Sequence, residues 1–152
     1  MNVLFKKLNF KAQEVIYVLN SPKSFQSEIA DMKTYCEVKT SLNEGENIEF
    51  VLLFATKQEE LDHHALLFEQ QSKGDVVIWF AYPKGSSKKY HCEFNRDTGW
   101  EAVGKSGFEP VRAVAIDEDW SALRFRRVAF IKTMTRSFAL TEEGKEKAGL
   151  LK

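Results

Sequence analysis

Cationic and hydroxyl side chains gather in one short polar segment that could bind an anion. The segment follows an apolar run ending at Tyr82, and it carries Lys84, Ser86 and Ser87. Gly85 would let the backbone approach a ligand closely, the hydroxyls can donate hydrogen bonds, and the lysine supplies positive charge. This chemistry suits a phosphate or a carboxylate, although the spacing is not that of a P-loop. The alternative interpretation is a solvated surface loop, because lysine-rich loops are usually exposed.

Asn95 and Arg96, a few residues further on, extend this candidate ligand-binding site. A helix beginning near Asn95 would add free backbone N–H groups and the positive end of a helix dipole. Arg96 could then orient a polar ligand. In the alternative interpretation Asn95 only caps the helix and Arg96 pairs with Asp97 or Asp117. The predicted ligand-binding set is therefore Lys84, Ser86, Ser87, Asn95 and Arg96.

The best candidates for catalysis are Asp117, as a general acid or base, and Tyr82, as a donor. Asp117 begins the stretch Asp-Glu-Asp before Trp120, where aspartates of a hairpin turn often bond to their own backbone. Trp120 could pack in the core or form an aromatic wall of a crevice. His91 and Cys92 invite interpretation as a base and a nucleophile. However, neighbours on an extended segment project to opposite sides.

Metal-ligand spacing is lacking in this sequence. His63 and His64 are adjacent, so on a helix they point about 100° apart and cannot form a two-ligand face. Glu60 is better aligned with His64, at the spacing of a surface ion pair. We therefore expect no metal site.

Charge and hydropathy limit the classes of partner. The 22 basic and 22 acidic side chains cancel, which argues against nucleic acid and charged membrane surfaces as partners. Arg124, Arg126 and Arg127, with Phe125 for stacking, could still contact nucleic acid, or they could protect an edge strand from aggregation. No apolar run approaches the roughly 20 residues that span a membrane. Two isolated cysteines and no recognisable leader predict a reduced, cytoplasmic protein.

Uninterrupted apolar runs predict the central strands, because a strand covered on both faces needs no polar side. These runs are residues 15–19, 50–54 and 76–81. Residues 36–40 alternate weakly and predict a short strand near a sheet edge. Residues 111–116 and 122–128 flank a short polar connection, which predicts an antiparallel hairpin.

Helix signals follow the predicted strands. Ser21 could cap a helix whose first residue is Pro22, with the apolar residues Phe25, Ile29 and Met32 at helical spacing. Thr56 and Glu59 have the spacing of a capping box, and Gly74 would end that helix. A shorter helix is predicted within residues 95–107, with Trp100 and Val103 inward.

Alternating strands and helices followed by a hairpin predict a three-layer α/β/α sandwich with a mainly parallel sheet and a C-terminal antiparallel hairpin. The chain length suits a single domain, which we place at residues 1–130. Residues 131–152 are predicted to form a polar C-terminal extension. Any ligand crevice should lie beyond the carboxyl ends of the strands.

This order of elements resembles the core of class I S-adenosylmethionine-dependent methyltransferases, and the closing hairpin is the distinctive part. The stretches 78–84, 95–97, 114–117 and 120–125 resemble a small bacterial family of methyltransferase-like proteins of unknown function. The resemblance covers roughly residues 10 to 129 and implies a methyltransferase-like Rossmann fold. It implies little about activity, because one fold supports many functions.

Three departures from the methyltransferase pattern bear on function. The turn at residues 20–24 has no glycine to bring the backbone close to the cofactor. Residues 38–42 have no acidic side chain where a ribose ligand is usual, and Glu44 and Glu46 lie further along, where they could substitute only by accident. The helix and strand that normally precede the strand at Phe50 are missing. We therefore expect no S-adenosylmethionine, and a noncatalytic domain that binds a small anionic ligand or a protein partner at the strand ends. The alternatives are a diverged transferase and a purely structural or interaction module.

Overall fold

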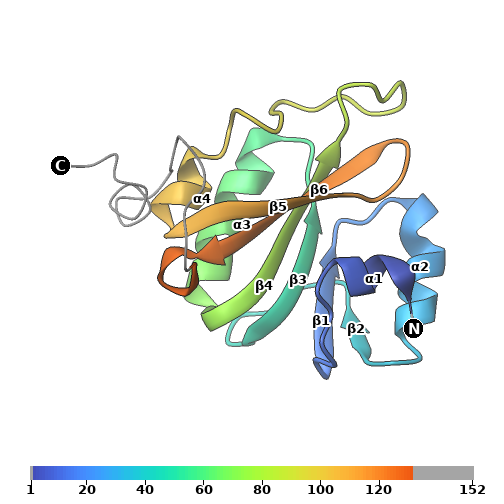
Figure 1. Ribbon diagram of the computed structural model, residues 1–152, viewed down its shortest axis with the longest axis vertical. Coiled ribbons are helices and arrows are strands. Elements are labelled where there is room, and N and C mark those ends of the chain that lie inside the picture. Colours follow the sequence, from blue (N-terminus) through green and yellow to red (C-terminus); the bar gives the residue numbers. More distant parts are fainter. Residues whose placement is uncertain (1, 132–152) are drawn as a thin grey trace.

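A six-stranded sheet with helices on both faces forms the centre of the molecule (Figure 1). The structure, a computed structural model, describes residues 2–131. The strands are β1 Val15–Leu19, β2 Glu37–Lys39, β3 Ile48–Phe54, β4 Ser72–Pro83, β5 Phe108–Ala115 and β6 Trp120–Arg127. The α-helices are α1 Val3–Lys7, α2 Gln26–Met32, α3 Gln58–Gln70 and α4 Glu101–Lys105, and 3₁₀ turns occupy Lys23–Phe25 and Val128–Phe130.

The strand order is β2-β1-β3-β4-β6-β5. Strands β1 to β4 are parallel, and β6 runs antiparallel between β4 and β5. This topology confirms the predicted α/β class and three-layer sandwich, with a mainly parallel sheet and a C-terminal antiparallel hairpin. The chain leaves β1 for β2 on one side and returns to β3 on the other, so the topological switch point lies between β1 and β3.

Each face of the sheet has its own apolar core. The α1 face packs strand residues against α1 and α2, and its buried members include Phe5, Ile16, Ile29, Phe50 and Trp79. The α3 face packs the alternate strand residues against α3 and α4, and its buried members include Leu61, Phe68, Ile78, Phe80 and Val103. Burial on both faces explains why the central strands are continuous apolar runs.

The predicted start of the second helix is wrong. Asn20 turns the chain with a φ of +59°, and Pro22 is extended with φ −71° and ψ 162°. Ser21 therefore does not cap a helix with Pro22 as its first residue. A 3₁₀ turn comes first, and α2 begins at Gln26, with Ile29 and Met32 buried as predicted.

Helix α3 begins one residue later than the Thr56 and Glu59 spacing predicts. Lys57 is the N-cap residue, and the Glu60 carboxylate accepts hydrogen bonds from the backbone N–H groups of Thr56 and Lys57 at 3.2 and 3.1 Å. The helix also ends before Gly74, which lies inside β4 with a φ of +65°. Pairing of Ser72 with β3 ends the helix and begins the strand.

Two further helices differ from expectation. Only residues 101–105 of the predicted helix within 95–107 are α-helical, although Trp100 and Val103 are buried as predicted. Helix α1 was not predicted. Its N-cap Asn2 accepts a hydrogen bond from the Phe5 N–H at 2.9 Å, and Phe5 is fully buried.

The sheet edges are β2, as predicted, and β5. Strand β6 lies inside the sheet, so the interpretation of its arginines as protection of an edge strand is wrong. Apart from Ile131, which is buried, the predicted C-terminal extension lies outside the described residues. Within residues 2–131 no helix is long and apolar enough to cross a membrane.

Candidate functional site

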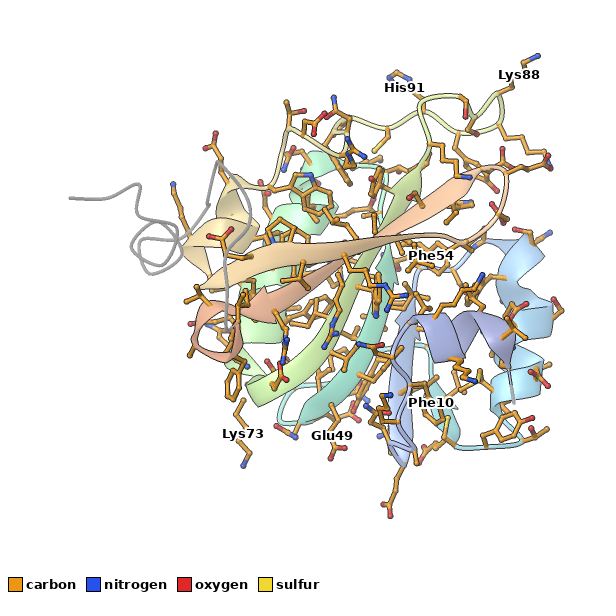
Figure 2. All side chains as sticks on the ribbon, in the orientation of Figure 1. Phe10, Glu49, Phe54, Lys73, Lys88 and His91 are labelled. Carbon is orange, nitrogen blue, oxygen red and sulfur yellow. The ribbon has the colours of Figure 1, made fainter. Side chains whose placement is uncertain are left out.

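A cavity of about 600 Å³ lies at the carboxyl end of β4, beside the start of β6. Its lining includes five of the residues predicted from sequence, namely Tyr82, Lys84, Ser87, Asn95 and Arg96. Figure 2 shows Lys88 and His91 at this end of the molecule, on the long connection from β4 to α4. The structure thus brings together most of the predicted site at the carboxyl ends of the strands, where α/β folds bind ligands.

The loop after β4 is fixed to the β5–β6 turn through Asp119. The Lys84 N–H donates to the Asp119 carbonyl at 2.7 Å, and the Ser87 hydroxyl donates to the Asp119 carboxylate at 3.0 Å. Ser87 also accepts a hydrogen bond from the Tyr90 N–H at 3.2 Å. Its hydroxyl is therefore engaged in holding the loop. Ser86 is exposed and does not line the cavity, so the lysine side chain is the donor that this loop offers.

Tyr82 forms part of the cavity wall and is mostly buried, with 5% of its surface exposed. Its ring packs against Phe94 and Trp100 at centroid distances of 6.2 and 5.8 Å. Burial raises the pKa of Tyr82, and a hydrogen bond with Ser121 acts in the opposite direction. The phenol is therefore protonated at neutral pH and can donate a hydrogen bond to a ligand.

Asn95 does not cap a helix. Its side-chain oxygen accepts hydrogen bonds from the N–H groups of Asp97 and Thr98 at 2.8 and 3.0 Å, which makes it the first residue of a turn. Arg96 follows in that turn, and its contact with Asp97 is long, at 3.8 Å between exposed side chains. Such a surface pair holds its partners weakly, so the guanidinium is available to a ligand.

The residues before this turn are tied to the start of α3. The Glu93 N–H donates to the Thr56 carbonyl at 2.9 Å. The Gln58 side-chain amide donates to the Gly99 carbonyl at 2.7 Å and to the Asp62 carboxylate at 2.8 Å. These bonds attach the segment that forms this wall of the cavity to the start of helix α3.

Asp117, the candidate acid or base, lies in the β5–β6 turn and does not line the cavity. Its carboxylate accepts hydrogen bonds from the N–H groups of Asp119 and Trp120, both at 2.8 Å. This is the backbone-bonding role that aspartates take in hairpin turns.

Cys92 and His91 line the cavity without the contact that a base and a nucleophile require. Within residues 2–131 no hydrogen bond joins their side chains. Burial raises the pKa of the Cys92 thiol, so it is protonated at neutral pH. The thiol is a packing group in this arrangement rather than an activated nucleophile.

The histidines of α3 make no metal centre. Nδ1 of His64 lies 2.7 Å from the Glu60 carbonyl oxygen, while the Glu60 carboxylate caps the helix, so the predicted Glu60–His64 ion pair is wrong. Burial lowers the pKa of His64. In the part of the chain that the structure describes, no group of three or more His, Cys, Asp and Glu side chains could hold a metal ion.

The switch point between β1 and β3 is packed with aromatic rings. Phe54, at the end of β3, contacts Phe25 edge-on at a centroid distance of 4.9 Å and Trp120 at 5.0 Å. All three side chains are at most 3% exposed. Trp120 is thus a core residue here, and it does not line the strand-end cavity. The hollow at the carboxyl edge lies two strands away from the switch point, at β4 and β6.

No local pattern predicts this aromatic cluster, because Phe25, Phe54 and Trp120 come from three distant segments. The turn at residues 20–24 is a local feature that bears on the cluster. Asn20 takes the left-handed conformation that a glycine would adopt more easily, and the chain then passes through Pro22 to bring Phe25 over the strand ends.

Several known structures similar to this one are methyltransferases. A SAM-dependent methyltransferase from Aquifex aeolicus matches with a TM-score of 0.56 and 9% identity, over 82% of this chain and 87% of that one. A putative type 11 methyltransferase from Sulfolobus solfataricus matches with a TM-score of 0.51 and 8% identity, over 82% and 89%. An S-adenosylmethionine-dependent methyltransferase from Clostridium acetobutylicum matches with a TM-score of 0.50 and 5% identity, over 82% and 88%.

At these identities the likeness shows a methyltransferase-like fold and not an activity. No family model matches the chain, and no curated protein matches it in sequence.

Proposed function

We propose that this protein is a noncatalytic, methyltransferase-like domain that binds a small anionic ligand in the cavity at the carboxyl end of β4. Lys84 and Arg96 would supply positive charge, and the Tyr82 phenol would donate a hydrogen bond. The observation that carries this proposal is the displacement of the hollow from the switch point to β4 and β6. Lys84, Arg96 and hydrogen-bond donors line that hollow, together with the carboxylates of Glu93, which is bonded to the start of α3, and Asp97. Aromatic rings fill the switch point.

The residues at the switch point do not fit S-adenosylmethionine. Phe25, Phe54 and Trp120 are packed where a cofactor would need space, and the turn beginning at Asn20 has no glycine. Near the ribose position, at the end of β2, the Lys39 ammonium forms an ion pair with Glu46. An ammonium cannot accept hydrogen bonds from ribose hydroxyls, and the Glu46 carboxylate beside it is already engaged by Lys39, the Tyr17 hydroxyl and the Asn43 N–H. These features favour a binding domain over a diverged transferase.

Two broader parts of the proposal concern origin and location. The resemblance of residues 78–84, 95–97, 114–117 and 120–125 supports membership of the small bacterial family named above. The two cysteines, Cys36 and Cys92, are both free, as is usual for proteins of the reducing cytoplasm. We place the domain there.

Calorimetric titration with inorganic phosphate and with citrate tests the proposal. We expect saturable binding of at least one of these anions, weakened about tenfold or more by the double substitution Lys84→Gln and Arg96→Gln, because each change removes a charge from the cavity. Lys88→Gln with Lys89→Gln is the matched control. It removes the same charge from exposed positions of the same loop that do not line the cavity.

S-adenosylmethionine is the decisive counter-probe in the same instrument. The proposal predicts no saturable binding of this cofactor to the wild-type protein. Saturable binding at micromolar concentrations would overturn the noncatalytic interpretation and restore the transferase alternative. If the Lys84 and Arg96 double variant bound the anion as tightly as the wild type, the cavity would not be the anion-binding site.

A further inference from the structure

Three arginines cluster on the α1 face of the sheet. Alternation along β6 places Arg124 and Arg126 on the same face as Ala122, which belongs to the α1-face core. In the strand register Arg112 of β5 lies opposite Arg124. We call Arg112, Arg124 and Arg126 the arginine face. Arg127 points to the other side, where it lies over the Phe108 ring and donates to the Ser72 carbonyl.

The arginine face occupies the half of the sheet that the described helices leave uncovered. Figure 1 shows β5 and β6 crossing in front of α3, with α1 and α2 set to one side over β1 and β2. The Trp79 indole donates to the Leu8 carbonyl at 2.8 Å, so cover from the α1 segment reaches as far as β4. Beyond β4 the α1 face carries guanidinium groups, and none of the helices within residues 2–131 lies over it.

Arg124 is 9% exposed, and its Nε is buried without a hydrogen-bond partner within residues 2–131. Burial lowers the pKa of Arg124, and the nearby Arg126 and Arg112 act in the same direction. Asp75 acts in the opposite direction. A buried guanidinium nitrogen without an acceptor is destabilising, and a bound anion would offset that cost.

The arginine face keeps an excess of positive charge. Arg126 is held by the Asp75 carboxylate through bonds of 2.8 Å from Nε and 2.6 Å from Nη2. Glu109, which pairs with Arg126 in the strand register, is fully buried. The carboxylates of Asp75 and Glu109 thus accompany three arginines, and Arg112, which is exposed, is the charge that a partner can reach most directly.

We propose that the arginine face docks an acidic segment of a partner protein. A guanidinium fork matches a carboxylate in geometry, and arginine is favoured at protein interfaces. A broad sheet face is the surface that this fold covers with helices, so an acidic helix would extend the α1 layer over β5 and β6. The neutral net charge of the chain argues against nucleic acid, which needs an extended basic field.

Fluorescence anisotropy with a labelled peptide built of glutamate and leucine at helical spacing tests this inference. We expect the wild-type protein to bind it and to ignore a matched peptide with lysine in place of glutamate. Arg112→Gln combined with Arg124→Met should weaken binding about tenfold or more. Arg112→Gln alone should weaken peptide binding about threefold. Because Arg112 is exposed, this variant should fold, and it keeps the test valid if the double variant does not.

The charge-matched control is Lys11→Gln with Lys33→Gln, both exposed and away from the arginine face. It should bind the acidic peptide like the wild type, as should the Lys84 and Arg96 double variant. Equal binding of the lysine peptide, or full binding by a folded Arg112 and Arg124 double variant, would overturn the inference. Tighter binding of single-stranded oligothymidylate that the same substitutions abolish would also overturn it, by reassigning the face to nucleic acid.

Discussion

The Glu93 carboxylate accepts a hydrogen bond from the backbone N–H of Gln58, the first residue of α3, at 2.8 Å. The two residues are 35 positions apart, and the bond joins the connection after β4 to a helix start that would otherwise present a free donor. A carboxylate there also faces the positive end of the helix dipole. Through this bond α3 positions the wall of the strand-end cavity.

Removal of that carboxylate should loosen both the helix start and the cavity wall. We expect Glu93→Ala to lower the free energy of unfolding by about 1 kcal/mol, as for the loss of a helix cap, measured by urea denaturation. Glu93→Gln keeps an acceptor and should lose less. Equal losses in the two variants would show that the hydrogen bond to Gln58 contributes nothing.

Gly99 should not tolerate a side chain. A Cβ at this position would lie 2.5 Å from the Phe94 Cβ and 2.7 Å from the Gln58 side-chain oxygen, and the backbone has a φ of +98°. We expect Gly99→Ala to destabilise the protein by about 2 kcal/mol or more, from strain and overpacking together. Thermal denaturation measures the effect.

Gly107→Ala separates these two causes. Gly107 has a similar φ of +91°, but a Cβ there would meet nothing within 4 Å. It should therefore show the backbone cost alone, about 1 kcal/mol. A Gly99→Ala loss no larger than that of Gly107→Ala would contradict the close packing of the cavity wall.

Trp79 and Trp120 form a matched pair for testing a buried hydrogen bond. The Trp79 indole N–H donates to Leu8, whereas that of Trp120 is buried without a partner within residues 2–131. Trp79→Phe should cost about 1 to 3 kcal/mol more than Trp120→Phe, because it leaves the Leu8 carbonyl without its donor. Chemical denaturation of the two variants checks this difference, and equal losses would contradict it.

Glu46 should make stability depend on pH in the acid range. Its hydrogen bonds to the Lys39 ammonium, then to the Tyr17 hydroxyl and the Asn43 N–H, lower its pKa from 4.5 to about 2. A pKa that is lower in the folded state stabilises the fold above pH 4.5, and this contribution is lost as the pH falls toward 2.

Urea denaturation at pH 7 and pH 3 tests this dependence with Glu46→Gln. The wild type should be the more stable protein at pH 7, and the difference between the two should shrink at pH 3. Glu49→Gln, at an exposed position of β3, is the control and should show no such change. A difference that stays constant with pH would contradict the assigned role of Glu46.

The central strands could be predicted from sequence because burial on both faces leaves a local signature. Residues 15–19 were predicted with both boundaries correct, and the runs at 50–54 and 76–81 lie inside longer strands. Helix starts were less predictable. Glu60 rather than Glu59 caps α3, because the direction of the chain after β3 decides which carboxylate reaches the free N–H groups.

The candidate site was predictable only in part, for a similar reason. Tyr82, Lys84, Ser87, Asn95 and Arg96 lie within one connection, so their proximity follows from the chain. The aromatic cluster at the switch point and the pairing of Arg112 with Arg124 depend on distant segments. A register shift between Pro110 and Arg112 decides which side chain faces Arg124, and no sequence pattern predicts that shift.

The location of the bound anion tests the central claim most directly. The ¹⁵N-labelled protein is titrated with inorganic phosphate, and backbone amide chemical shifts are measured by NMR. The shifts should change at Lys84, Ser87 and residues 92–97, and they should stay unchanged at residues 20–22 and 55–56. Titration with S-adenosylmethionine should move neither set. Saturable shifts at residues 20–22 and 55–56 on addition of S-adenosylmethionine would contradict the account, because they would place a cofactor where Phe25, Phe54 and Trp120 are packed.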